Sequence, residues 1–135
     1  MDATFLEKIK SDFPNLKFRV GKKFAFRPPR TIIIGPEEPN DSLLLLHELG
    51  HALLNHSDFN IDIDRLKMER EAWTKAKELS ALYEEVIFDE GLMERELDTY
   101  RDWLYRKSRC PKCGLTRFQG RNRRYCCPKC DASEF

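Results

Sequence analysis

The chain lacks the features that mark membrane and exported proteins. No apolar run in its 135 residues approaches the roughly 20 residues of a membrane-spanning helix. Residues 1–4 show neither the basic head nor the apolar core of a signal peptide. Cysteine is absent before residue 110, which excludes a disulfide framework through the larger part of the chain. These absences predict a soluble, cytoplasmic protein that does not contact the membrane.

Net charge is also nearly absent, but its distribution is uneven. The formal net charge is +1. Residues 1–105 carry 15 Lys and Arg against 21 Asp and Glu, whereas residues 106–135 carry nine against two. The asymmetry indicates either a basic module that meets an anionic partner such as nucleic acid, or a short solvated segment whose sign is incidental.

Hydrophobic periodicity predicts helices and short strands, with no internal repeat in residues 1–105. Helices are expected over residues 2–12, 42–56, 62–88 and 92–107, and strands over residues 16–20, 24–27 and 31–34. A helix, then short strands, then helices is typical of the α+β class, here with a small antiparallel sheet. We expect one domain over residues 1–107 and a small cysteine-rich module over residues 108–135.

The most informative motif is His47-Glu48-Leu49-Gly50-His51, which lies in an apolar stretch. On a helix, residues four apart share a face, so His47 and His51 can direct two imidazoles at one metal ion. Glu48 lies beside that ion and can take a proton from water there. This H-E-x-x-H arrangement is typical of a zinc hydrolase. The alternative is two structural histidines on a core helix.

A hydrolytic zinc site needs a third protein ligand. The remaining histidine, His56, lies five residues after His51, and a rotation of about 500° would turn it off the metal face. We therefore expect it to be a helix-end residue. Glu69 and Glu71 on the next helix are candidates, of which only one can serve because they point in different directions. Small Ala72 and Ala76 on that helix would allow close packing.

These residues resemble the ImmA/IrrE-like zinc metallopeptidases. The resemblance rests on His47 to Leu54 and on Glu69-Arg70-Glu71-Ala72 with Ala76 and Glu78-Leu79, and it spans about residues 30–80. It implies an endopeptidase with Glu69 as the third zinc ligand and a protein substrate, often a DNA-bound regulator. The chain departs from the family at Trp73 and Lys75. A polar group at position 73 could orient a ligand histidine, which Trp73 cannot do by accepting a hydrogen bond, so Glu71 stays an alternative ligand.

Two further parts of a peptidase site remain open in the sequence. Strand residues Ile32–Ile34 are a candidate edge for an extended substrate, or else a core strand. A second oxyanion donor is not identifiable, and Tyr83, Tyr100 and Tyr105 are all candidates.

The cysteines form two C-P-K-C pairs separated by 13 residues, Cys110 with Cys113 and Cys127 with Cys130. Four thiolates close a tetrahedral zinc site, so the segment resembles a zinc ribbon whose ion is structural. The alternative is a pair of redox-active dithiols. Cys126 is expected to be a free thiol. The chain should therefore hold two zinc ions, one catalytic and one structural.

Between the cysteine pairs, residues 117–125 interleave basic and aromatic side chains. Such a segment can contact a phosphate backbone and stack on bases, or it can form a solvated hairpin that covers the zinc site. The sequence as a whole predicts a zinc metallopeptidase acting on a protein or peptide. Two alternatives are a catalytically idle zinc-binding interaction module and a SprT-like protease that acts on DNA-bound proteins.

Overall fold

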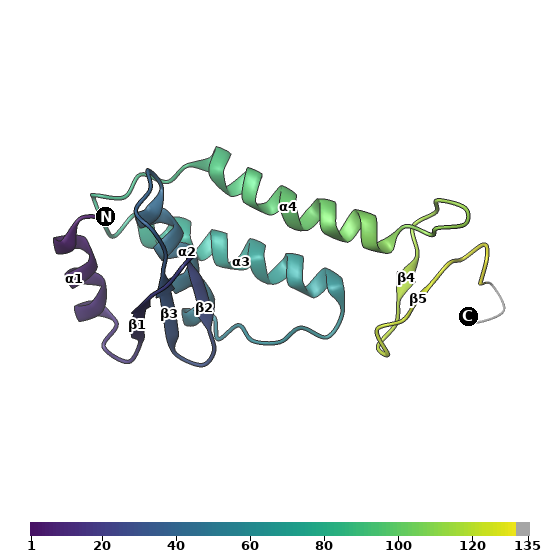
Figure 1. The fold of residues 1–135 in the computed structure, drawn as a ribbon, viewed down its shortest axis with the longest axis horizontal. Helices are drawn as coiled ribbons and strands as arrows, with labels where there is room; N and C mark the ends of the chain where they lie inside the picture. Colours follow the sequence, from purple (N-terminus) through teal and green to yellow (C-terminus); the bar gives the residue numbers. More distant parts are fainter. Residues whose placement is uncertain (132–135) are drawn as a thin grey trace. The chain divides into compact units, whose positions relative to one another are not determined.

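The computed structural model of the protein describes residues 1–131. The chain, whose helices and strands are labelled in Figure 1, divides into two compact units. Unit 1 comprises residues 1–57 and 70–90, and unit 2 comprises residues 58–69 and the chain from residue 91 onward. These units do not follow the predicted domains 1–107 and 108–135, because the segment after residue 91 groups with the cysteine-rich part. The domain assignment stays a prediction.

The element order confirms the α+β class. The helices are α1 (Ala3–Asp12), α2 (Asp41–Leu53), α3 (Asp62–Ser80) and α4 (Glu90–Ser108). The strands are β1 (Lys17–Val20), β2 (Ala25–Arg27), β3 (Thr31–Ile34), β4 (Phe118–Gln119) and β5 (Tyr125–Cys126). None of the helices in residues 1–131 has the length and apolar character needed to cross a membrane.

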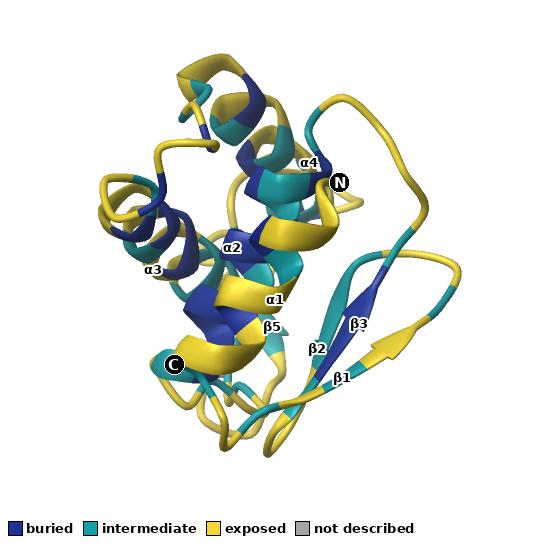
Figure 2. Cartoon of the chain, turned by 90° about the vertical axis from the view of Figure 1, so that its left-hand side faces the viewer, coloured by how far each residue is buried: buried dark blue, intermediate teal, exposed yellow. Residues whose placement is uncertain are grey.

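The sheet of unit 1 has the order β1-β3-β2. Strand β3 pairs antiparallel with β2 but parallel with β1, with Phe18 opposite Ile32. The sheet is therefore mixed: the predicted antiparallel pairing is confirmed for β2 with β3 and is wrong for β1 with β3. Figure 2 shows β3 as the buried strand between two more exposed neighbours. The alternative of a core strand is thus confirmed for Ile32–Ile34, and the edge-strand alternative is wrong.

Helix α2 is the central helix of unit 1, and it packs against β2 and β3. Its buried residues include four leucines that share one face, since Leu43, Leu46 and Leu49 are three residues apart and Leu45 is four residues before Leu49. The buried side chains of α1, Phe5 and Ile9, complete this core with Ile32 of β3. The metal motif thus lies on a helix whose orientation is fixed by packing.

Helices α2 and α3 approach each other closely at Gly50. A Cβ atom added to Gly50 would lie 2.6 Å from the carbonyl oxygen of Ala72. Ala72 and Ala76 are both fully buried. The prediction that small residues let these helices approach is therefore confirmed.

Helix α3 ends at Ser80, which corrects the predicted end at residue 88. The chain after Ser80 turns to pack on α1 instead of continuing the helix. Tyr83 is buried edge-on against Phe5, with 5.6 Å between ring centroids, and its hydroxyl donates to Asp12 at 2.6 Å. Burial, together with the Asp12 carboxylate, raises the pKa of Tyr83. These contacts are distant in sequence, so local periodicity cannot predict them.

In unit 2, Asp62 at the start of α3 joins three elements. Its backbone N–H donates to Gln119 Oε1 at 2.6 Å, and the Tyr125 hydroxyl donates to its carboxylate at 2.7 Å. Lys107 near the end of α4 lies 3.0 Å from the same carboxylate. The β4–β5 hairpin is therefore tied to the helices of its unit by a buried acidic side chain.

Candidate metal centres

The H-E-x-x-H residues form a compact group on α2. The potential ligand atoms of His47, Glu48 and His51 all lie within 4.8 Å of one another. His47 and His51 are buried, with 7% and 8% of their surface exposed. Their ring centroids lie 4.8 Å apart, and Glu48 Oε1 lies 3.6 Å from His47 Nδ1. The predicted convergence of two imidazoles on one side of the helix is present.

Trp73 of α3 holds the His47 ring by stacking. The indole and imidazole rings are nearly parallel, with 11° between their planes and 4.3 Å between centroids. Trp73 is fully buried, and its Nε1–H has no hydrogen-bond partner within the described residues. The sequence left open what replaces the polar group expected at this position. In the structure, Trp73 restrains the plane of the His47 ring by packing instead of by a hydrogen bond.

His56 lies against His51, although helical rotation was expected to turn it away. Helix α2 ends at Leu53, so the rotation argument does not extend to residue 56. Asn55 adopts a left-handed conformation with φ of 54°. The two Nδ1 atoms of His51 and His56 lie 2.9 Å apart. His56 is a helix-end residue as predicted, but its position beside the metal motif was missed.

The two candidate third ligands differ in exposure. Glu71 is exposed, and its Oε2 lies 3.9 Å from His56 Nε2. Glu69 is partly buried and belongs to the segment of α3 in unit 2, one residue before the segment in unit 1. Glu69 as the third ligand stays a prediction.

The donor set of α2 fits a divalent metal ion. Two neutral imidazoles and a neighbouring carboxylate are ligand types that zinc prefers, and buried imidazoles need partners for their nitrogen atoms. The group can therefore hold a metal ion. His47 and His51 would supply nitrogen ligands, with Glu48 beside them.

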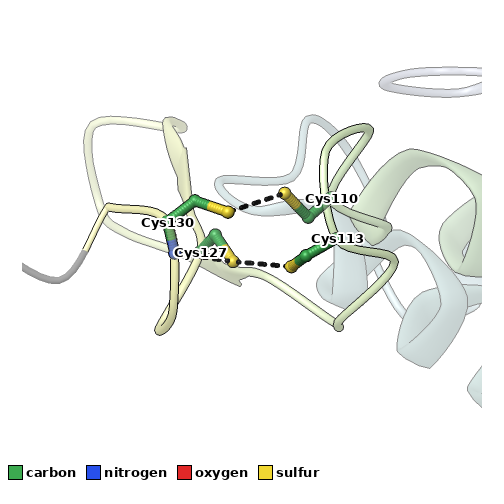
Figure 3. Close-up of side chains that lie close together, drawn as sticks. All are labelled: Cys110, Cys113, Cys127 and Cys130. Carbon is green, nitrogen blue, oxygen red and sulfur yellow. Dashed lines mark hydrogen bonds between the residues drawn. The ribbon is translucent and has the colours of Figure 1, made fainter.

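The second centre is a cluster of four thiols in unit 2 (Figure 3). The sulfur atoms of Cys110 and Cys130 lie 3.9 Å apart, and those of Cys113 and Cys127 lie 3.5 Å apart. Four sulfurs at the usual distance from a tetrahedral zinc ion lie about 3.8 Å from one another. The predicted convergence of the two cysteine pairs is present, and the cluster can hold a metal ion.

The thiols of this cluster differ in acidity. Backbone N–H groups of Cys113 and Lys112 lower the pKa of Cys110 to about 6, because they stabilise its thiolate. Hydrogen bonding with Cys113, followed by burial, raises the pKa of Cys130. No cysteine in residues 1–131 forms a disulfide. Cys126 lies on β5 opposite Phe118, outside the four-thiol group.

Part of the basic segment has a structural role. Arg117 donates to the Lys107 carbonyl oxygen at 2.8 Å and lies over the Tyr125 ring, while Arg123 donates to the Phe59 carbonyl oxygen at 3.1 Å. Arg121 and Phe118 are exposed, with 63% of the surface of Phe118 accessible to solvent. Arg117 and Arg123 therefore hold the hairpin to the rest of its unit, whereas Arg121 and Phe118 are exposed. Contact of the segment with nucleic acid stays a prediction.

Comparisons with protein-family models, with curated proteins and with solved structures found no match. The likeness to the ImmA/IrrE-like peptidases thus stays an expectation from the motifs.

Proposed function

We propose that this protein is a zinc-dependent metalloendopeptidase whose active site is built on α2. The observation that carries the proposal is the convergence of His47, Glu48 and His51 on a buried helix, with their ligand atoms within 4.8 Å. An idle structural site needs metal ligands but no base. A carboxylate beside the ligand pair therefore favours hydrolysis over an interaction module.

Each residue has a separate role in the proposed reaction. His47 and His51 would hold the zinc ion, which acts as a Lewis acid toward water and a peptide carbonyl. Glu48 accepts a proton as water attacks the carbonyl and then donates that proton to the leaving amine. Trp73 keeps the His47 ring in one plane, which limits the rotation that would move its nitrogen off the ion.

Replacing the proposed base tests this function. Glu48→Gln keeps the shape of the side chain but removes its basicity, so we expect peptide hydrolysis to fall by about 10²–10⁴-fold. Zinc content and fold should stay unchanged. Cleavage of an unstructured protein substrate, followed by mass spectrometry, provides the measurement. A Glu48→Gln protein that cleaves at the native rate would refute the role of Glu48 as the base.

We propose Glu69 as the third zinc ligand, because the sequence of α3 resembles the corresponding helix of the ImmA/IrrE-like metallopeptidases. We expect Glu69→Ala to weaken zinc binding at the histidine site more than Glu71→Ala does, because loss of a ligand is costlier than loss of a supporting group. Competition with a chelator, followed through the NMR signals of the histidine rings, measures the zinc affinity of each variant. The reverse order of the two affinities would transfer the ligand role to Glu71.

For the cysteine cluster we propose a structural zinc ribbon. Four thiolates leave no open position for a substrate, so this ion would stabilise the hairpin and take no part in hydrolysis. The exposed basic and aromatic side chains suit contact with nucleic acid, which would bring the peptidase to DNA-bound proteins. Trapping of partners with Glu48→Gln in cells would distinguish a repressor-type substrate from the broader targets expected of a SprT-like protease.

A further inference from the structure

A row of three neighbouring side chains, one hydrogen-bonded pair followed by one charged group, leads from His51 to the surface of unit 1. His51 Nδ1 lies 2.9 Å from His56 Nδ1, and His56 Nε2 lies 3.9 Å from Glu71 Oε2. The His56 side chain is only 10% exposed, whereas that of Glu71 is 46% exposed. The row therefore runs from the buried metal motif to an exposed carboxylate.

The end of α2 explains how His56 reaches this position. The Asn55 N–H donates to the Ala52 carbonyl oxygen at 3.1 Å, and the His56 N–H donates to the His51 carbonyl oxygen at 3.0 Å. Together with the left-handed Asn55, these two bonds form a Schellman cap. The cap reverses the chain and returns residue 56 to the level of residue 51. The same turn that ends the helix thus brings the two imidazoles together.

Hydrogen-bond chemistry then selects the protonation pattern. Two nitrogen atoms 2.9 Å apart share one proton, so one is the donor and the other the acceptor. If His56 accepts at Nδ1, its proton lies on Nε2 and faces the Glu71 carboxylate, which is favourable. The opposite arrangement would leave the lone pair of neutral His56 Nε2 facing a carboxylate. It would also protonate Nε2 of neutral His51, which could then not ligate a metal through that atom.

We infer that His56 and Glu71 are positioning residues that fix His51 as the Nδ1–H tautomer, in which Nε2 carries no proton and can therefore act as a metal ligand. This inference rests on the metal site of the proposed function. Glu71 acts through His56 and does not ligate. The 3.9 Å separation is longer than a direct hydrogen bond, so its effect is electrostatic or carried by a bridging water.

The tautomer can be measured without any enzyme activity. The chain has only three histidines, so long-range ¹⁵N–¹H spectra of protein labelled at histidine resolve each ring. With zinc supplied only to the cysteine cluster, we expect native His51 to show the Nδ1–H pattern. His56→Phe, which keeps a ring but removes the acceptor, should give mixed tautomers and weaken zinc binding at the histidine site by about 10–100-fold.

Glu71→Gln provides a second variant that does not disturb the core, because this side chain is exposed. We expect Glu71→Gln to change the tautomer populations of His51 and to weaken zinc binding at the histidine site in the same direction as His56→Phe, but by a smaller factor. Glu78→Gln is the matched control on α3, since Glu78 is 63% exposed and pairs with Lys75. It should leave both readouts unchanged.

The outcomes separate this inference from the peptidase proposal. An Nε2–H pattern for native His51, or native zinc affinity and tautomer in His56→Phe, would overturn the positioning role even if the protein cleaves peptides. The expected tautomer and affinity changes in a protein that cleaves no peptide would support the positioning role and count against hydrolysis.

Discussion

The two candidate metal centres differ in what holds their ligands in place. His47 and His51 project from a helix whose own leucines are buried in the core, and Trp73 packs on the ring of His47. The four cysteines of the cluster lie in turns before and after a hairpin of two-residue strands, and of these four only Cys110 and Cys127 are buried. Packing can preform the first site without an ion. The second has too little buried apolar surface to form without one.

Removal of metal should give the largest difference between the two centres. We expect a strong chelator to unfold residues 108–131 but to leave α2 protected from amide hydrogen exchange. The reason is that structural zinc contributes roughly 10–16 kcal/mol to folding in small thiolate sites. Cys113→Ser at saturating zinc should reproduce the loss in the hairpin. Equal loss of protection in α2 would show that the histidine site also depends on its ion.

The contact between α2 and α3 should give an intermediate effect confined to unit 1. In Gly50→Ala the new Cβ would lie 2.6 Å from the Ala72 carbonyl oxygen, so the helices must separate. We expect the free energy of unfolding of unit 1 to fall by about 1–3 kcal/mol, despite the higher helix propensity of alanine. Chemical denaturation followed by a probe in unit 1 measures the change.

Gly120→Ala is the matched control for that substitution. Its added Cβ would meet only the side-chain oxygen of Asn122, at 3.2 Å. It should change the stability of unit 1 by nothing measurable. If the Gly50→Ala protein matched the native one, the close approach of the helices would not limit stability.

The smallest effect is expected from Asp62, which ties the hairpin to the helices of unit 2. Burial alone would raise the pKa of Asp62, but hydrogen bonds from Tyr125 and Lys107 outweigh it and lower the pKa. Its stabilisation is therefore present above the ordinary pKa of 3.8 and is lost as pH falls through the lower folded value. Burial and Asp62 raise the pKa of Tyr125 to about 12. Its contribution is therefore complete below the ordinary value of 10.0 and is lost as pH rises through the folded value.

Asp62→Asn should consequently lower the stability of unit 2 by about 1 kcal/mol, with little change between pH 6 and pH 9. Hydrogen exchange of the hairpin in zinc-saturated protein measures this difference. Asp98→Asn is the control, because Asp98 is 62% exposed on α4. A difference that varied strongly within this pH range would mean that another group titrates there and sets the stability of the hairpin.

Features that depend on residues close together in the sequence could be predicted. The Thr31–Ile34 strand agrees with its predicted bounds, and α2 begins within one residue of its predicted start, because β-branched runs and apolar periodicity act over a few residues. The convergence of the four cysteines on one site was predicted from the C-x-x-C spacing of zinc-binding segments. In each case the signal and the structure lie in the same short segment.

Features that depend on distant contacts were not predictable. The early end of α3 depends on Tyr83 packing on α1, and the parallel pairing of β1 depends on where the chain crosses the sheet. His56 was missed because one left-handed residue, Asn55, ends the helical rotation on which the expectation relied. Trp73 stacks on His47 because α2 and α3 pack together. A comparison of residue types at position 73 gives no information on that packing.

The placement of the two tryptophans has a practical consequence. Trp73 belongs to unit 1, buried against an imidazole, and Trp103 belongs to unit 2, where Arg65 and Lys107 lie over its ring. Each unit thus contains one tryptophan, and the two tryptophans lie in different environments. Replacing one indole at a time would leave an optical signal that follows a single unit in the unlabelled protein.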